Sequence, residues 1–241
     1  MSSPDQQIVL VIGASRGLGL ALVEKLTKSP TTRALGTVRT QSPTLQLELE
    51  AQLPSATFLT ADITNEASLL SAAQQLPGGE LDVLIVNAGM GARDPVTQSS
   101  TDTLAAYLDT NVLGPHRAIR AFLPALRARK TRKIILISSS SGCLTQQAMP
   151  DSIGLAGCYG TSKAALNMLA VQTSNELNRA GEGFTVVSIH PGWVATDMGN
   201  KVGDGGMPPA ESASKILELV GRLETSDSAS FYKFDGEKMP W

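Results

Sequence analysis

The segment IVLVIGASRGLG at residues 8–19 decides the fold, because it joins an apolar run to a glycine-rich turn and the start of a helical pattern. An apolar run without alternation indicates a strand that is covered on both faces. Glycines at 13, 17 and 19 allow the main chain to turn tightly and approach a pyrophosphate at a helix N-terminus. The spacing is G-x-x-x-G-x-G, not the commoner G-x-G-x-x-G. Its place between strand and helix predicts a dinucleotide-binding turn, with a purely structural turn as the alternative.

The same alternation of short apolar runs and amphipathic segments continues along the chain. Strands are predicted at 8–12, 34–38, 57–59, 83–86, 134–137, 185–189 and 231–234. Helices are predicted at 17–29, 43–52, 65–76, 102–129, 159–180 and 209–222, with a break in the fourth near Asn111 and a cap on the third from Thr64 or Asn65. No repeat or linker divides residues 1–241. This order predicts a single-domain α/β Rossmann fold, a doubly wound seven-stranded parallel sheet with helices on both faces.

Composition excludes several classes of function. The 241 residues carry a net charge of −2 without a basic run, which argues against a nucleic-acid partner. No apolar stretch approaches the ~18 residues of a membrane span, and the polar first seven residues do not resemble a signal peptide. A cytoplasmic location is therefore expected. Cys143 and Cys158 lack metal-ligand spacing, so no metal site is predicted. Two reduced thiols are expected, with a disulfide or redox switch as the alternative.

The residues after the second predicted strand bear on the choice of dinucleotide. NAD sites place a carboxylate there for the ribose 2′-hydroxyl, whereas this chain has Arg39 and no carboxylate before Glu48. A guanidinium can bind a 2′-phosphate bidentately. Arg16 in the glycine turn can supply a second positive group, so the pair favours NADP(H), although either arginine alone could be a solvated surface charge. Asp62 is predicted to accept a hydrogen bond from the adenine amine, or else to flank the next helix.

Polar residues end two further predicted strands and begin a long helix. Residues 87–89 read Asn-Ala-Gly, and residues 138–142 read Ser-Ser-Ser-Ser-Gly. Tyr159 and Lys163 are four residues apart and therefore share one helix face. An ammonium about 4 Å from a phenol contributes on the order of 4 kcal/mol at an effective dielectric of 20. This pair predicts a tyrosine whose pKa is lowered towards neutrality, against the alternative of a packed tyrosine and a solvated lysine.

These motifs, taken in order, resemble the short-chain dehydrogenase/reductase superfamily over nearly the whole chain. The glycine turn, the Asn-Ala-Gly segment, Asn111, the serine run, Tyr159-x-x-x-Lys163 and the Pro-Gly pair at 191–192 follow the family's order. Finer features, such as HPGWVATDM at 190–198 and the final DG and PW pairs within 235–241, resemble the C-factor/sniffer-like carbonyl reductase branch. Ile12 and Val86 depart from the usual threonine and asparagine, and Tyr159 follows Ser139 by an unusually long 20 residues.

The resemblance implies a role for each matching residue. Ser139 would orient the substrate, with Ser138 and Ser140 as register alternatives. Tyr159 would exchange a proton with the carbonyl or alcohol, Lys163 would lower its pKa and hold the nicotinamide ribose, and Asn111 would hold a relay water. The residues implied at the cofactor are Gly13, Ser15, Arg16, Gly17, Leu18, Gly19, Arg39, Asp62, Ile63, Asn87, Ala88, Gly89, Tyr159, Lys163, Pro191, Gly192, Val194 and Thr196.

The implied activity is reduction of a ketone or aldehyde with NADPH. The alternatives are a dehydratase or isomerase on the same fold, or a non-catalytic NADP(H)-sensing protein. Segments expected around the substrate contain Met90, Met149, Trp193, Met198 and Met207. If these line the site they predict a small-molecule substrate with apolar bulk, and the alternative is that half of them belong to the core. The segment 143–157 is expected to form a loop over the pocket, and 199–209 either a mobile lid or a loose surface loop. A homodimer or homotetramer is the expected assembly.

Overall fold

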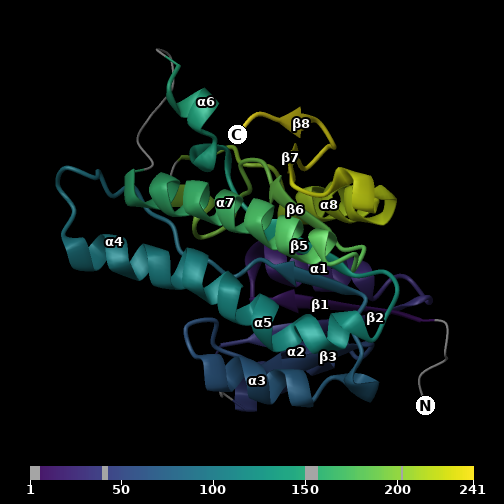
Figure 1. The fold of residues 1–241 in the computed structure, drawn as a ribbon. Helices are drawn as coiled ribbons and strands as arrows, with labels where there is room; N and C mark the ends of the chain where they lie inside the picture. Colours follow the sequence, from purple (N-terminus) through teal and green to yellow (C-terminus); the bar gives the residue numbers. More distant parts are fainter. Residues whose placement is uncertain (1–5, 40–42, 150–156, 202) are drawn as a thin grey trace.

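The computed structural model describes residues 6–39, 43–149, 157–201 and 203–241. One sheet runs through the molecule in the order β3-β2-β1-β4-β5-β6-β7-β8 (Figure 1). Its strands are β1 Gln7–Ile12, β2 Thr32–Val38, β3 Ala56–Thr60, β4 Val83–Val86, β5 Lys133–Ile137, β6 Thr185–His190, β7 Ser230–Lys233 and β8 Lys238–Met239. The first seven strands pair in parallel, which confirms the predicted sheet. The unpredicted β8 is antiparallel to β7 and has only two residues, too few for a recognisable pattern.

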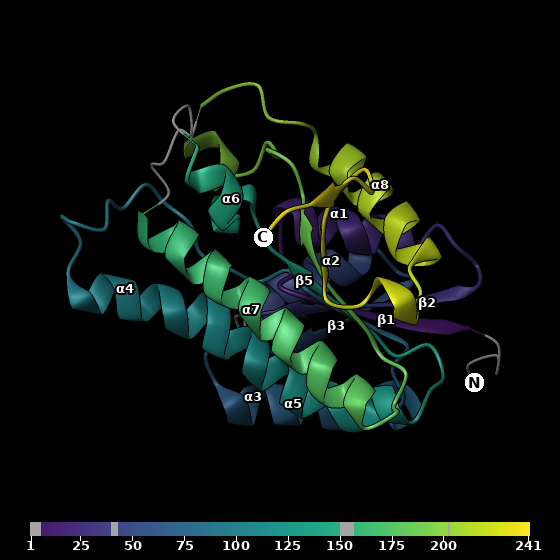
Figure 2. The same cartoon turned by 45° about the horizontal axis from the view of Figure 1, so that its top comes forward.

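Helices cover both faces of this sheet (Figure 2). They are α1 Gly17–Leu26, α2 Pro43–Gln52, α3 Glu66–Gln74, α4 Thr101–Leu108, α5 Gly114–Arg127, α6 Leu144–Gln147, α7 Gly157–Arg179 and α8 Pro209–Arg222. Short 3-10 turns lie at η1 Pro77–Gly79, η3 Ser140–Gly142, η4 Gly199–Lys201 and η5 Thr225–Asp227. Helices α3, α5 and α7 pack on one face, and α1, α2 and α8 on the other.

The apolar residues of the central strands divide between two cores. In β1, Leu10 and Ile12 belong to the core under α3, α5 and α7, whereas Val9 and Val11 belong to the core under α1, α2 and α8. Successive side chains of a strand point to opposite faces, so a strand with two covered faces must be apolar throughout. This explains the continuous apolar runs in the sequence.

The predicted break near Asn111 is instead a widened helical turn. A π-helical segment, η2 Asp109–Leu113, joins α4 to α5 without interruption. Pro115 has no N–H to donate to the carbonyl of Asn111 four residues earlier, and one widened turn accommodates this loss. A second local expectation concerned the cap of α3: Asn65 is the N-cap and accepts a hydrogen bond from the Ser68 N–H.

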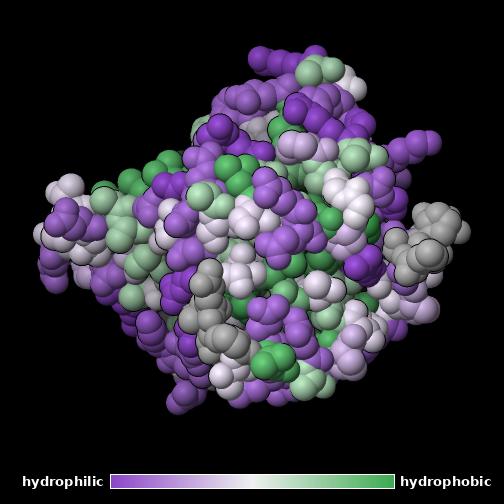
Figure 3. All heavy atoms as spheres, turned by 90° about the horizontal axis from the view of Figure 1, so that it is seen from below, coloured by the Kyte–Doolittle hydropathy of each residue, from purple (hydrophilic) through white to green (hydrophobic). Residues whose placement is uncertain are grey.

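The surface seen from below in Figure 3 mixes hydrophilic side chains with smaller hydrophobic patches. In the part of the chain that the structure describes, no helix combines the length and apolar character needed to cross a bilayer.

Candidate active site

The glycine turn connects β1 to α1 at the carboxyl end of the sheet. Gly13 and Gly17 have φ values of 83° and 57°, which favour glycine. A Cβ on Gly13 would lie 2.7 Å from the Cβ of Ala88, and one on Gly19 would overlap the carbonyl oxygen of Gly13. Both the backbone conformation and the close approach of β4 therefore require glycine in this turn.

Hydrogen bonds from neighbouring strands hold the turn in place. The Gly13 N–H donates to Thr37 Oγ1 at 2.9 Å, and Asn87 Nδ2 donates to the Gly13 carbonyl at 2.8 Å. Asn87 was expected here from sequence, whereas Thr37 was not. The feature that could have pointed to Thr37 is a hydroxyl near the end of an apolar strand, because a fully buried hydroxyl needs a hydrogen-bond partner. Thr37 supplies a side-chain hydrogen bond to the turn that Ile12 cannot provide.

The first turn of α1 is suited to an anion. Arg16 is the N-cap residue, its side chain makes no capping hydrogen bond, and the first turn contains no acidic residue. The first N–H groups of a helix have no partner within the helix and lie at the positive end of its dipole. Together with the glycine approach, this arrangement fits the pyrophosphate of a dinucleotide.

The two arginines that were expected at a 2′-phosphate have different surroundings. Arg39 is exposed just after β2 and has no ion-pair partner among the described residues. Arg16 Nη1 lies 2.8 Å from Asp197 Oδ2, and both side chains are mostly exposed. This ion pair connects the glycine turn to the segment after β6, and the sequence motifs did not suggest it.

Asp62 shows the helix-flanking arrangement that was its alternative role. Its Oδ1 accepts hydrogen bonds from the Thr64 N–H at 2.9 Å and from Thr64 Oγ1 at 2.7 Å. The adjacent Ile63 is buried against Gly114, where a Cβ would lie 2.8 Å from Ile63 Cγ1. The hydrogen bond from adenine to Asp62 stays a prediction. It would use the second carboxylate oxygen, because Oδ1 already accepts from Thr64.

Only one serine of the run meets Tyr159. Ser138 Oγ donates a buried hydrogen bond to Asn167 Oδ1 at 2.6 Å, so this hydroxyl has a structural role. The Ser139 side chain lies close enough to Tyr159 to lower its pKa, and its Oγ also accepts a hydrogen bond from the Ser141 N–H. The tertiary structure thus brings Ser139, rather than Ser138, to the tyrosine hydroxyl.

Burial dominates the electrostatics of Tyr159 and Lys163. It raises the pKa of Tyr159 above its usual 10.0, and the hydrogen bond with Ser139 offsets part of this rise. Burial also lowers the pKa of Lys163 from 10.5 to about 8. Lys163 is 5% exposed, and its Nζ donates to the Ile137 carbonyl at 2.8 Å and lies 5.7 Å from the centroid of the Tyr159 ring.

These values correct the expectation of a tyrosine pKa lowered towards neutrality. The expectation assumed an ammonium about 4 Å away in an environment of dielectric 20, where attraction exceeds desolvation. In the structure Lys163 is buried and Tyr159 is partly buried, so desolvation disfavours phenolate and ammonium alike. The phenol consequently stays protonated at neutral pH.

Asn111 is fully buried and ties β4 to α7. Its Oδ1 accepts from the Met90 N–H, and its Nδ2 donates to the Met90 carbonyl and to Ser162 Oγ, each at 2.9 Å. Ser162 Oγ in turn donates to the Tyr159 carbonyl at 2.7 Å. Both amide N–H donors are therefore used in structural bonds. The relay water that the resemblance implies stays a prediction. It would have to donate a hydrogen bond to an acceptor position of Asn111 that is not already used.

The segment after β6 packs against the glycine turn. A Cβ on Gly17 would lie 3.1 Å from Thr196 Cγ2, and Thr196 Oγ1 accepts from the Gly199 N–H. Pro191 accepts a hydrogen bond from Ser212 Oγ through its carbonyl, and Gly192, with φ 82°, packs against the Phe234 ring.

The segment 199–209, which was expected to be a lid or a loose surface loop, is hydrogen-bonded to the preceding segment near both of its ends. Trp193 Nε1 donates to the Gly199 carbonyl at 3.1 Å. Val194 pairs with Met207 in an isolated parallel bridge, and the Ala195 N–H donates to the Met207 carbonyl at 2.8 Å.

The loop after β4 and the segment after β6 approach Tyr159 through Gly91 and Met198. Gly91 lies between Met198 and Tyr159, since a Cβ there would be 2.8 Å from Met198 Sδ and 3.3 Å from Tyr159 Cε2. The side chains of Met149, Trp193 and Met198 are exposed to solvent. Of the expected pocket loop 143–157, residues 150–156 lie outside the described residues.

Neither Cys143 nor Cys158 forms a disulfide. Cys143 and Cys158 are free and buried, and Cys143 Sγ donates to the Pro240 carbonyl at 3.0 Å. The described residues contain no group of three or more His, Cys, Asp or Glu side chains that could hold a metal ion.

Comparison with known proteins agrees with this geometry. The family model described as short chain dehydrogenase matches residues 7–205. The C-signal protein of Myxococcus xanthus is 36% identical over 164 residues, covering 68% of this chain and 94% of that protein. The structure of an NADPH-bound carbonyl reductase from chicken fatty liver superposes with a TM-score of 0.88 at 30% identity, covering 98% of this chain and 99% of that one. For the carbonyl reductase Sniffer of Drosophila melanogaster the TM-score is 0.86 at 27% identity, covering 98% and 100%.

The chain therefore belongs to the short-chain dehydrogenase family. It is an oxidoreductase of that family, and its similarity to C-signal and to the Sniffer carbonyl reductase confirms the expected branch.

Proposed function

We propose that the protein is an NADP(H)-dependent carbonyl reductase that converts a ketone or aldehyde to an alcohol. The observation that carries the proposal is the Ser139 side chain beside Tyr159, with Lys163 buried one helical turn away. NADPH-bound and Sniffer-type carbonyl reductases share the fold, which supports the same cofactor and reaction class here. A cytoplasmic location and a homodimer or homotetramer belong to the same proposal.

The dinucleotide would be held by groups at the carboxyl ends of β1, β2 and β6. The uncapped N–H groups of α1 would bind the pyrophosphate, and Arg39 and Arg16 the 2′-phosphate. Thr196, beside Gly17, would meet the nicotinamide end, and Lys163 its ribose. When bound, the reduced nicotinamide supplies the hydride for the carbonyl carbon.

Tyr159 supplies the proton in this scheme. Because burial keeps its phenol protonated at neutral pH, Tyr159 is suited to donate to a carbonyl oxygen that gains negative charge. Ser139 orients the same oxygen, and the Lys163 ammonium stabilises the phenolate that remains. The scheme is therefore written as a reduction, with the proton from Tyr159 and the hydride from the bound cofactor.

The substrate is proposed to carry apolar bulk. Met198 lies beside Gly91 and Tyr159, and a flexible thioether adapts to apolar ligands of different shape.

Replacing the phenol tests the proposal. Tyr159→Phe should lower turnover at least ~10³-fold in a screen of ketones, aldehydes and quinones, while the Kd for NADPH changes less than about twofold. NADPH consumption and cofactor fluorescence measure the two quantities. Substantial residual turnover in the variant, or no NADPH consumption by the unmodified protein with any carbonyl, would contradict the assignment.

A further inference from the structure

A second tyrosine lies directly behind Tyr159. Tyr107 on α4 is fully buried, and its ring meets the Tyr159 ring edge-on, with centroids 6.4 Å apart and an interplanar angle of 61°. Edge-to-face contact is a preferred aromatic geometry, so a fixed Tyr107 ring restricts the orientation of its neighbour.

The Tyr107 ring is itself fixed by the loop after β4. Its hydroxyl donates a hydrogen bond to Asp94 Oδ2 at 2.6 Å. Desolvation, followed by the hydrogen bond to Asp94, raises the pKa of Tyr107 well above its usual range. The phenol therefore remains a donor to the carboxylate throughout the working pH range.

The same loop also holds the first turn of α7. The Asp94 carbonyl accepts the Cys158 N–H at 3.1 Å, one of the N–H groups that has no partner within the helix. Gly157 has φ 42°, and a Cβ there would overlap the Asp94 carbonyl oxygen, so this approach requires glycine. Cys158 directly precedes Tyr159 in the chain.

Asp94 thus reaches Tyr159 by two routes, one through its side chain and Tyr107, the other through its main chain and Cys158. We propose that Asp94 and Tyr107 are positioning residues that hold the Tyr159 hydroxyl against Ser139. This inference rests on the proposed function, in which Tyr159 is the proton donor. Tyr159 is the proton donor in the proposed scheme, and the glycine turn, Arg39 and Thr196 hold the dinucleotide, so the effect should fall on the chemical step more than on cofactor binding.

The chain offers a matched control for the experiment. Tyr232 in β7 is also buried, at 8% exposure, and its hydroxyl donates to Asp227 Oδ1 at 2.8 Å. This pair lies outside the site described above. Tyr107→Phe and Tyr232→Phe each remove one phenol hydroxyl from a tyrosine–aspartate hydrogen bond and keep the ring.

Steady-state kinetics and cofactor titration on the full chain test the inference. Tyr107→Phe should lower kcat about tenfold, because a small displacement of a reacting group costs up to ~10²-fold in rate. The carbonyl KM and the NADPH Kd should change less than about twofold. Tyr232→Phe should lose thermal stability to a similar extent with kcat unchanged. Asp94→Ala, which keeps the main-chain bond to Cys158, should lower kcat as Tyr107→Phe does, and the double variant no further.

Each contrary result has a distinct meaning. If Tyr107→Phe and Asp94→Ala lower kcat no more than Tyr232→Phe does, or raise KM instead, the positioning role is overturned. If Tyr107→Phe fails to fold, Asp94→Ala decides by the same criteria. Retained turnover in Tyr159→Phe would instead overturn the proposed function, whereas an inactive Tyr159→Phe beside a fully active Tyr107→Phe rejects only this inference.

Discussion

Arg16 and Arg39 show how identical side chains acquire different properties from their neighbours. Arg39 has no ion-pair partner among the described residues, while Arg16 pairs with Asp197. An exposed pair of this kind contributes about 0–1 kcal/mol, so a bound phosphate can displace the carboxylate at small cost. Asp197 should therefore weaken, without preventing, phosphate binding by Arg16.

Removing the charge of Asp197 tests this competition. Asp197→Asn should tighten NADPH binding by about two- to fivefold, since it releases a guanidinium worth up to ~1 kcal/mol, and leave the Kd for NADH unchanged. Arg39→Asp serves as the opposite control and should shift preference towards NADH. Fluorescence titration at low and high salt measures both, and the effect should diminish at high salt. An NADPH-to-NADH ratio that is unchanged in Asp197→Asn would contradict the competition.

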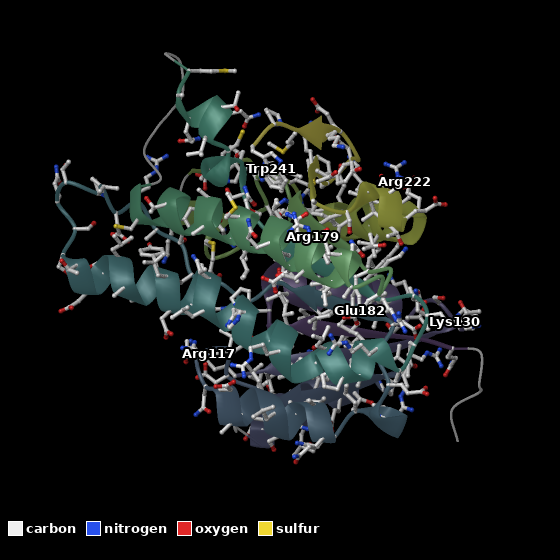
Figure 4. The ribbon with its side chains drawn as sticks, in the orientation of Figure 1. Arg117, Lys130, Arg179, Glu182, Arg222 and Trp241 are labelled. Carbon is white, nitrogen blue, oxygen red and sulfur yellow. The ribbon has the colours of Figure 1, made fainter. Side chains whose placement is uncertain are left out.

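At the level of elements, helix α6 depends on contacts from distant segments. It has four residues, too few for an isolated helix to be stable. The Thr145 N–H and Oγ1 both donate to the Trp241 carbonyl, at 2.9 and 2.7 Å. The Trp241 ring stacks on Phe231 with centroids 5.7 Å apart and an angle of 14°, and Figure 4 shows Trp241 near the β7–β8 hairpin. Since α6 begins five residues after Ser139 in the chain, we expect this packing to help define one side of the proposed substrate site.

Loss of the Trp241 indole ring should therefore weaken binding of the carbonyl substrate more than binding of the cofactor. Trp241→Ala should raise the carbonyl KM several-fold and lower stability by about 1–2 kcal/mol, because a stacked aromatic pair is lost. The NADPH Kd should stay unchanged. Trp241→Phe, which keeps a stacked ring, should restore most of both losses. Equal effects of Trp241→Ala on KM and on NADPH binding would show that α6 does not position the substrate.

At the level of the whole molecule, buried Lys163 makes stability depend on pH. The pKa of Lys163 is about 8 in the folded protein and 10.5 in the unfolded chain. Between pH 8 and pH 10.5 the unfolded chain therefore binds more protons than the folded protein does. Stability should therefore rise with pH across this window, by up to about 3 kcal/mol from this residue.

Chemical denaturation from pH 7 to 11 checks the sign. Lys163→Met should be more stable than the unmodified protein at pH 7, and the difference should shrink as pH rises through 8 to 10.5. Comparing the two proteins cancels other groups, including Tyr159, whose raised pKa lowers stability only at higher pH. A difference that is constant with pH would show that Lys163 is not desolvated in the folded state.

The candidate site was only partly predictable, and particular residues show why. The glycine turn and the Tyr159–Lys163 spacing are local patterns with a known geometric meaning. For the serine run, by contrast, the resemblance favoured Ser139 but left Ser138 and Ser140 open, because Asn167, which binds Ser138, lies on a distant helix. The pKa of Tyr159 likewise depends on desolvation by segments that are remote in the chain.

The order of apolar runs and helical patterns by itself determined the parallel sheet and its two covered faces, because these follow from periodicity. The short motifs indicated the family through their resemblance to it. Only the tertiary structure decided that Tyr107 and Asp94 support Tyr159, that Asp197 faces Arg16, and that Trp241 holds α6. Such contacts join segments far apart in the chain, and their geometry exists only once both cores have packed.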